Sequence, residues 1–217
     1  GEVGYRALVK VLPTESSKYA QFGGKVFETT VGRLLFNSAL PSDYPFINKE
    51  IRKKSMGPIV EELIDLYGIE AVSAIMDKIK NFGFKYVTKA GITWGIDEVQ
   101  VAKGKAEMIE EGHTRVAEVQ NQFNDGLLAD EERYEKTIDI WNDIIARIKK
   151  AVPESLKLHS SVDDMVKSEA RGSIGQVAQM AGMKGLIINN TGRVIDYPVI
   201  PSYKEGLSPI DYFVTTH

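Results

Sequence analysis

Apolar residues recur at helical spacing in two stretches of residues 104–150, and the rest of the chain is organised around this pattern. In each stretch the apolar or small positions are separated by 3 or 4 residues. This spacing keeps one narrow stripe facing a partner helix while the other faces stay charged. The two stripes consist of Ile109, Gly112, Val116, Val119 and Phe123, and of Tyr134, Ile138, Trp141, Ile145 and Ile148.

A short segment between the two stretches predicts a tight reversal of the chain. Gly126 suits the left-handed conformation that ends a helix, and Asp130 is a candidate N-cap for the second helix. Because so short a connection forces the helices antiparallel, we expect a coiled-coil hairpin. Helices of about 20 residues, rising about 1.5 Å per residue, would make it about 30 Å long. Its tip comprises Asn124, Asp125, Gly126, Leu127 and Leu128.

The N-terminal part of the chain mixes strand and helix signals. Residues 4–12 and 22–30 have strand composition and are expected to pair antiparallel. From residue 31 the spacing becomes helical, and Pro41 stops this short helix. A further short helix is expected over residues 48–54.

Glycine and proline divide the next part of the chain. Gly57-Pro58 predicts a break, and two amphipathic helices over residues 59–67 and 70–80 are separated by Gly68. Residues 81–101 are expected to be loop-rich. Their aromatic side chains either line a ligand pocket or pack as loops against a sheet or a neighbouring subunit.

Beyond the hairpin, capping signals mark two more helices. Pro153 is expected to end the second arm, and Ser161 with Asp164 forms a candidate capping box for the next helix. Residues 176–183 continue helically, and residues 186–195 predict a β-hairpin. The last helix starts at Ser208 as N-cap, followed by Pro209 and Asp211. The chain is therefore expected to adopt a mainly helical α+β fold.

Composition narrows the class of protein. The 217 residues are 43% hydrophobic and 26% charged, typical of a soluble globular protein. No run of about 18 apolar residues predicts a membrane span, and no signal peptide is visible. The absence of cysteine excludes disulfides and thiolate chemistry.

The charge is unevenly placed along the chain. Residues 103–150 carry 8 Lys/Arg against 11 Asp/Glu, so they hold the whole formal charge of −3. Five acidic residues around the hairpin tip face only Arg133. They form either a solvated helix end or a docking surface for a basic partner. These acidic residues are Asp125, Asp130, Glu131, Glu132 and Glu135.

No self-contained active site is evident in the sequence. His113, His159 and His217 are far apart and lack carboxylates at ligand spacing, so a metal site is not expected. Phosphate-loop and nucleophile-elbow motifs are absent. Arg171 is the exception, because it lies between a helix end and two glycines. It is either a phosphate-binding arginine or a surface arginine at a helix break.

Several motifs, taken in order, resemble the largest, catalytic subunit of multisubunit RNA polymerase, the bacterial beta-prime chain. Residues 168–173 and 179–186 resemble its signature, and residues 205–207 and 212–217 resemble the entry into its bridge helix. Further matches occur upstream in the same order. They lie at residues 29–37, 45–48, 91–97 and 132–141.

The resemblance implies a division of the chain into four regions. Residues 1–101 correspond to the end of the pore region, and residues 102–153 to the rim-helix hairpin of the secondary channel. Residues 154–185 correspond to the funnel segment that bears the F-loop. Residues 186–217 correspond to a β-hairpin and the start of the bridge helix.

The resemblance also implies roles for individual residues. Arg171 would bind the phosphates of the incoming nucleoside triphosphate, with Met165, Gly172 and Ser173 near the active site. The hairpin tip, residues 124–128, would dock transcript-cleavage factors that enter the secondary channel. No residue of the chain would be catalytic or bind a metal.

The resemblance further implies metal ions, partners and a cellular location for the complete enzyme. The Mg²⁺ ions of two-metal nucleotidyl transfer would be held by segments outside this chain. Partners would be the remainder of the subunit, the other polymerase subunits and, through the complex, DNA and RNA, with no membrane. The location would be cytoplasmic, at the nucleoid.

Two hypotheses of different class follow. In the first, the chain is part of a DNA-directed RNA polymerase subunit and is not catalytic alone. In the second, it is a free-standing helical-hairpin adaptor that binds protein. The absence of an initiator Met, together with a last helix that has barely begun, favours a piece of a longer protein.

Overall fold

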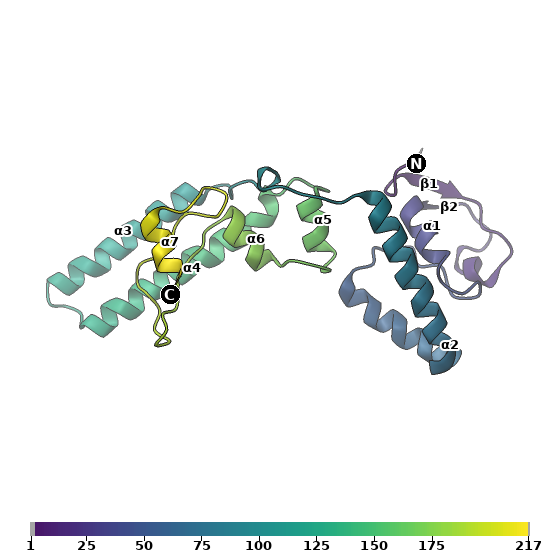
Figure 1. The fold of residues 1–217 in the computed structure, drawn as a ribbon, viewed down its shortest axis with the longest axis horizontal. Coiled ribbons are helices and arrows are strands. Elements are labelled where there is room, and N and C mark those ends of the chain that lie inside the picture. Colours follow the sequence, from purple (N-terminus) through teal and green to yellow (C-terminus); the bar gives the residue numbers. More distant parts are fainter. Residues whose placement is uncertain (1–2, 217) are drawn as a thin grey trace. The chain divides into compact units, whose positions relative to one another are not determined.

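The computed structural model describes residues 3–216 and divides into two compact units, with the boundary after Ile92. The mainly helical α+β fold is confirmed, with a single two-stranded sheet among the described residues (Figure 1). The named pore, rim, funnel and bridge regions stay predictions.

The first unit begins with the expected strand pair. Strand β1 (Leu8–Val11) pairs antiparallel with β2 (Phe27–Thr30). The second strand is shorter than predicted, because a 3₁₀ helix, η1 (Ser17–Phe22), precedes it. Helix α1 (Val31–Asn37) follows directly, and the Thr30 side chain accepts a hydrogen bond from the Arg33 amide as its N-cap.

Helix α2 (Lys53–Ala90) corrects two predictions. The short helix expected over residues 48–54 does not form, and Pro58 lies inside α2 instead of breaking the chain. A proline so near the start removes a single backbone donor, and the remaining turns still form. Gly68 does interrupt the helix, as predicted, with φ 76° and ψ 157°.

The second half of α2 also replaces the loop predicted from residue 81. Phe82 and Tyr86 are four residues apart, so they share one helix face, with ring centroids 4.7 Å apart. Phe82 meets Phe36 of α1, and Tyr86 meets Tyr5. Phe82 and Tyr86 therefore pack within this unit, whereas Phe84 is exposed. The buried core of this unit consists of Leu40, Tyr44, Ile59, Leu63, Val72 and Ile75.

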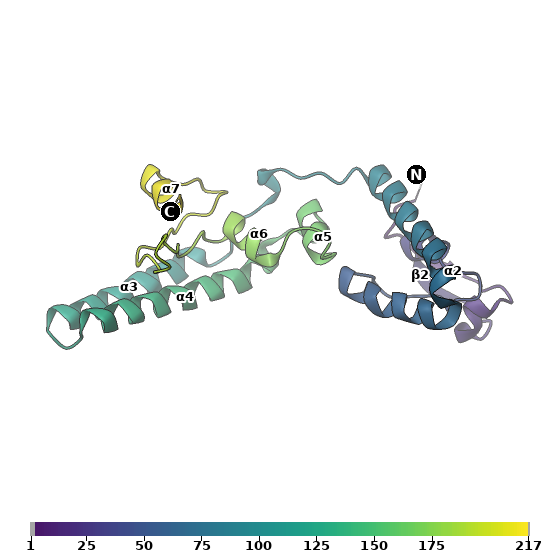
Figure 2. The same ribbon diagram turned by 60° about the horizontal axis from the view of Figure 1, so that its bottom comes forward.

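The second unit contains both predicted hairpin helices. Helix α3 (Lys105–Asn124) and helix α4 (Asp130–Ser155) lie side by side, with the chain reversing between them (Figure 2). A short 3₁₀ helix, η2 (Ile96–Glu98), precedes them. Trp141 is 2% exposed, and a Cβ at Gly112 would lie 2.9 Å from its indole ring. The knobs-into-holes geometry of a coiled coil stays a prediction.

The stripe predicted on α4 is partly wrong in phase. Ile138 and Ile145 are only half-buried, whereas Ile140 and Ile144 are buried. The reason is that α4 has two packed sides. Besides α3, it contacts α6 (Ile174–Ala181) and the segment near Gly185, whose Cβ would meet Ile145 at 3.2 Å.

Three local predictions near the end of the chain need correction. Helix α4 continues past Pro153 to Ser155. The N-cap of helix α5 (Ser161–Lys167) is Ser160 and not Ser161, and its side chain accepts from the Asp163 amide. Within the β-hairpin predicted over residues 186–195, no strand forms and one isolated bridge, Ile188–Val194, is present; a second bridge, Gly185–Val199, lies just outside it.

The start of the last helix is as predicted. Helix α7 (Pro209–Thr215) has Ser208 as N-cap, Pro209 in its first turn and Asp211 completing the capping box. His217 lies outside the described residues. No helix of the described chain is long and apolar enough to cross a membrane.

Candidate functional site

The loop between α5 and α6 carries the predicted phosphate-binding residues. Arg171 is exposed and makes no hydrogen bond or ion pair with another residue of 3–216. Glu169 and Gly172 adopt positive φ of 60° and 78°, so the backbone turns sharply on both sides of Arg171. An exposed guanidinium without an internal partner is available to an anion, because all its donors are free.

Ser173, two residues after Arg171, is the N-cap of helix α6. Its Oγ accepts from the Gln176 amide as the N-cap of α6, 3.3 Å away. Met165 is half-buried on α5, and its carbonyl accepts from Ser168 Oγ at 2.9 Å. The structure therefore brings Arg171, Gly172 and Ser173 together at the start of α6, while Met165 lies on the preceding helix.

A hollow of about 380 Å³ borders this loop, between α4 and α6. Two ammonium groups lie on it: Lys149 from α4, and Lys184, which donates to Gln179 at 3.1 Å. Sequence reasoning assigned neither lysine to this site, because each belongs to a different segment from Arg171. Its other lining residues are Ile145, Ile148, Ser173, Gly175, Gln176, Ala178 and Met183.

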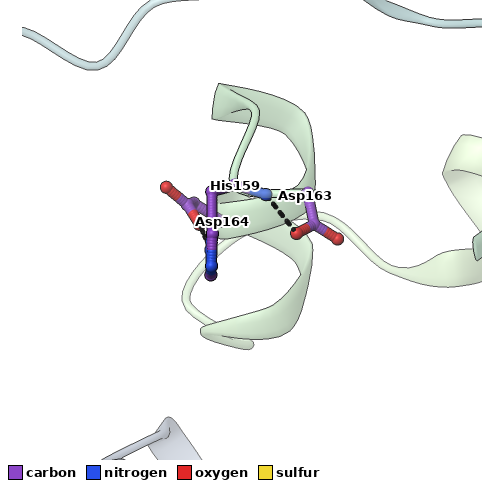
Figure 3. A group of neighbouring side chains, drawn as sticks. All are labelled: His159, Asp163 and Asp164. Atoms are coloured by element: carbon purple, nitrogen blue, oxygen red, sulfur yellow. Dashed lines mark hydrogen bonds and ion pairs between the residues drawn. The ribbon is translucent and has the colours of Figure 1, made fainter. Parts of the chain in front are cut away.

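A histidine and two aspartates meet at the start of α5, contrary to the prediction that no histidine has carboxylates nearby (Figure 3). Their potential ligand atoms lie within 4.8 Å of one another. Asp163, however, is 2% exposed and accepts from the His159 amide and from Lys167 Nζ, each at 3.0 Å. Because the ammonium already neutralises this carboxylate, the group caps a helix and does not fit a metal ion.

Asp163 gives this helix start a defined acid sensitivity. Burial alone would raise the pKa of Asp163, but the hydrogen bonds from Lys167 and the His159 amide lower it below its ordinary value. The stabilisation is therefore present above about pH 3.9 and lost as the pH falls through the lowered pKa. Asp163→Asn should destabilise the chain near neutrality but not in acid, as measured by urea unfolding from about pH 6 to about pH 2. A difference that stays constant over this range would contradict the assignment.

The hairpin tip has the predicted left-handed glycine. Gly126 has φ 75°, and the Leu127 amide donates to the Gln122 carbonyl at 2.9 Å. Asp130 is the first helical residue and not the N-cap, which is Ala129. Leu127 is 72% exposed at the end of this reversal. An apolar side chain so exposed on a tight turn is available for contact with a partner.

The acidic end of the hairpin has more basic partners than the sequence indicated. Arg133 bonds Asp130 at 2.9 Å and Asp196 at 3.3 Å. Arg193 lies 3.6 Å from a Glu131 carboxylate oxygen, besides packing over the Tyr134 ring. The 189–196 turn therefore adds one basic partner, Arg193, and one further carboxylate, Asp196, so this end of the hairpin keeps its net negative charge.

Comparison with known proteins covers both units. A family model described as RNA polymerase Rpb1, domain 3, matches residues 5–99, and the model described as domain 4 of the same protein matches residues 114–210. The chain belongs to the RNA polymerase Rpb1 family. The two matched regions follow one another in domain order and together include the hairpin tip, Arg171 and most of the elements described above.

Individual relatives of this Rpb1-family chain are bacterial. The DNA-directed RNA polymerase subunit beta′ of Heliobacterium modesticaldum is 39% identical over 99% of the chain. Those of Beutenbergia cavernae and Nocardioides sp. are 42% and 35% identical over 88% and 100% of it. The chain spans only 19%, 15% and 17% of the lengths of these three relatives.

Proposed function

We propose that the chain is a segment of the catalytic subunit of a DNA-directed RNA polymerase and forms part of its nucleotide-entry channel. The observation that carries the proposal is the pair of matches to consecutive Rpb1 domains across both units. The adaptor hypothesis accounts for the hairpin alone. It gives no reason for the similarity of residues 5–99 to the same subunit.

Within this function, Arg171 is assigned to the triphosphate of the incoming nucleotide. The exposed guanidinium, the sharp turns at Glu169 and Gly172 and the nearby ammonium of Lys149 all favour an anionic ligand. A guanidinium can hold two phosphate oxygens at once, which an ammonium cannot do with the same geometry.

The hairpin tip, residues 124–128, is assigned to the docking of transcript-cleavage factors. Its exposed leucine and acidic Asp125 offer one apolar contact and one charge to a basic partner. The tip lies at the far end of two packed helices, so binding there need not disturb Arg171.

The metal chemistry is assigned to other parts of the subunit. Two-metal nucleotidyl transfer needs clustered carboxylates that are free to bind both ions. The described residues offer one His/Asp group, and it is occupied by a helix cap and Lys167. The Mg²⁺ ions therefore have no fitting site in this part of the chain.

The proposal is tested by comparing the chain with the assembled enzyme. The full subunit, assembled with the other polymerase subunits, should extend an RNA primer on a DNA template in the presence of Mg²⁺. The 217-residue chain alone should give no extension above a no-protein control. Failure of the assembled enzyme, or extension by the chain alone, would contradict the proposed division of labour.

Leu127→Asp in the assembled enzyme should weaken factor-stimulated transcript cleavage and leave nucleotide addition unchanged. Losing the apolar contact costs about 1.5–3 kcal/mol of docking energy, or roughly 10- to 150-fold in the factor concentration required. Leu158→Asp is the matched control, because Leu158 is 65% exposed and lies away from the tip. Equal effects of the two changes, or no effect of Leu127→Asp, would remove the tip as the docking site.

A further inference from the structure

The C-terminal end of α6 is the meeting point of two distant parts of the second unit. The last carbonyls of a helix have no partner within it and must be satisfied from outside. Here the Ala102 amide donates to Ala181 at 2.9 Å, from the segment that leads into α3. The amides of Tyr203 and Lys204 donate to Gln179 and Met180, each at 3.0 Å, from the segment that leads into α7.

An ion pair between a buried lysine and a partly exposed glutamate connects the same two segments directly. Lys105, the first residue of α3, is 6% exposed, and its ammonium donates to Glu205 Oε2. The same oxygen accepts from the amide and the hydroxyl of Ser202, at 2.8 and 2.7 Å. Ser202 is completely buried. The carboxylate is thus held by three donors, which fix both ends of the 202–205 turn.

A lysine is rarely buried unless it is paired, and the pair here joins residues separated by 100 positions. Only Glu205 gives this ammonium a countercharge among the described contacts. Removing one partner alone leaves the other charge partly buried without compensation, whereas removing both does not. The loss of either partner alone should therefore disturb the 202–205 turn more than the loss of both.

We propose that Lys105 and Glu205 are positioning residues, which hold the entry into α7 in a fixed orientation against the base of the hairpin and the end of α6. Since the loop with Arg171 leads into the other end of α6, the pair sets the geometry between this anion-binding loop and α7. The expected effect on nucleotide addition rests on the proposed function. The expected effect on the structure of residues 202–216 does not depend on it.

The test uses Lys105→Met in the assembled polymerase, with two readouts. The maximal rate of nucleotide addition should fall about 10- to 100-fold with an unchanged apparent KM. The reason is that a change distant from the reacting atoms can still displace them slightly, and a small displacement slows the reaction strongly. Amide hydrogen exchange over residues 202–216 should become faster. Glu205→Gln, which keeps the shape and the Ser202 contacts, should show the same two changes if Lys105→Met fails to assemble.

Two further variants separate positioning from general damage. Lys105→Met/Glu205→Gln should recover part of the rate lost in Lys105→Met, since neither charge is then left unpaired. Arg147→Met is the matched control, because the Arg147–Glu111 ion pair joins α3 and α4 on their exposed face. Its rate and exchange should equal those of the unmodified enzyme.

The outcomes distinguish the inference from the proposed function. Unchanged rate and unchanged exchange in Glu205→Gln would overturn the positioning role while the unmodified enzyme still made RNA. Equal losses in Arg147→Met would overturn it as well. An unmodified assembled enzyme that made no RNA would instead refute the proposed function, and the exchange over residues 202–216 would still decide the structural part.

Discussion

Replacing Trp141 by alanine is expected to destabilise the second unit by about 3–5 kcal/mol. The indole is 2% exposed and lies between the two hairpin helices, with the His113 ring edge-on at 5.2 Å. Gly112 faces it so closely that a Cβ would lie 2.9 Å from the ring. Removing the indole therefore leaves a cavity at this close contact between the helices. Urea unfolding of the chain, followed by circular dichroism, measures the loss.

Glu118→Ala is the matched control on the same hairpin. Glu118 is exposed on the outer face of α3, so its change should stay within roughly 0.5 kcal/mol. Similar losses for the two variants would mean that the buried seam does not hold the helices together. The exposed ion pairs between α3 and α4 would then be the main source of the hairpin's stability.

Arg171→Ala in the assembled polymerase is expected to raise the apparent KM for nucleoside triphosphates. Losing a charge-assisted contact is worth about 1.5–3 kcal/mol, or roughly 10- to 150-fold. Arg171→Lys should recover only part of the loss, because an ammonium cannot reproduce the planar fork. Steady-state nucleotide addition at varied triphosphate concentration provides the measurement.

Lys157→Ala controls for the general loss of positive charge. Lys157 is exposed, basic and in the same unit, but it lies away from the α5–α6 loop. It should leave the apparent KM unchanged. If Arg171→Ala behaved like Lys157→Ala, Arg171 would be a surface arginine at a helix break, the other hypothesis that the sequence allows.

The sequence predicts best where one packed face decides the structure. The helices α3 and α4, the reversal at Gly126 and the cap at Ser208 all follow from local spacing and capping chemistry. The phase of α4 does not, because its second packed side faces residues that follow 30 to 40 positions later in the chain, Gly182 against Ile148 and Gly185 against Ile145. No local pattern shows that Ile140 and Ile144 are more buried than Ile138.

The region after Gly57 shows how local signals mislead. Gly57-Pro58 and Gly83 indicate breaks in the sequence, yet the chain is helical through both, and α2 reaches Ala90 with its predicted interruption at Gly68. The signal present was the spacing of Phe82 and Tyr86, which fits one helix face against Phe36. Packing on that face outweighs the weak helix propensity of Gly83.

Only some residues of the candidate site could be predicted from the sequence. Arg171 and the tip residues come from sequence motifs, and the structure gives their exposure and surroundings. Lys149 beside the α6 start and the Lys105–Glu205 pair could not be predicted, since each depends on contacts between distant segments. Their residue types are common on helix surfaces, so their sequence positions alone indicate nothing.

The most direct test of the account is a photo-crosslink from position 171 to the nucleotide. A photoreactive phenylalanine analogue replaces Arg171 in the assembled enzyme, halted on a DNA template with an RNA primer whose 3′ end cannot be extended. We expect a γ-³²P-labelled nucleoside triphosphate to crosslink there when it matches the template base, and far less when it does not. No crosslink, or a crosslink independent of the template, would contradict the placement of Arg171 at the substrate triphosphate.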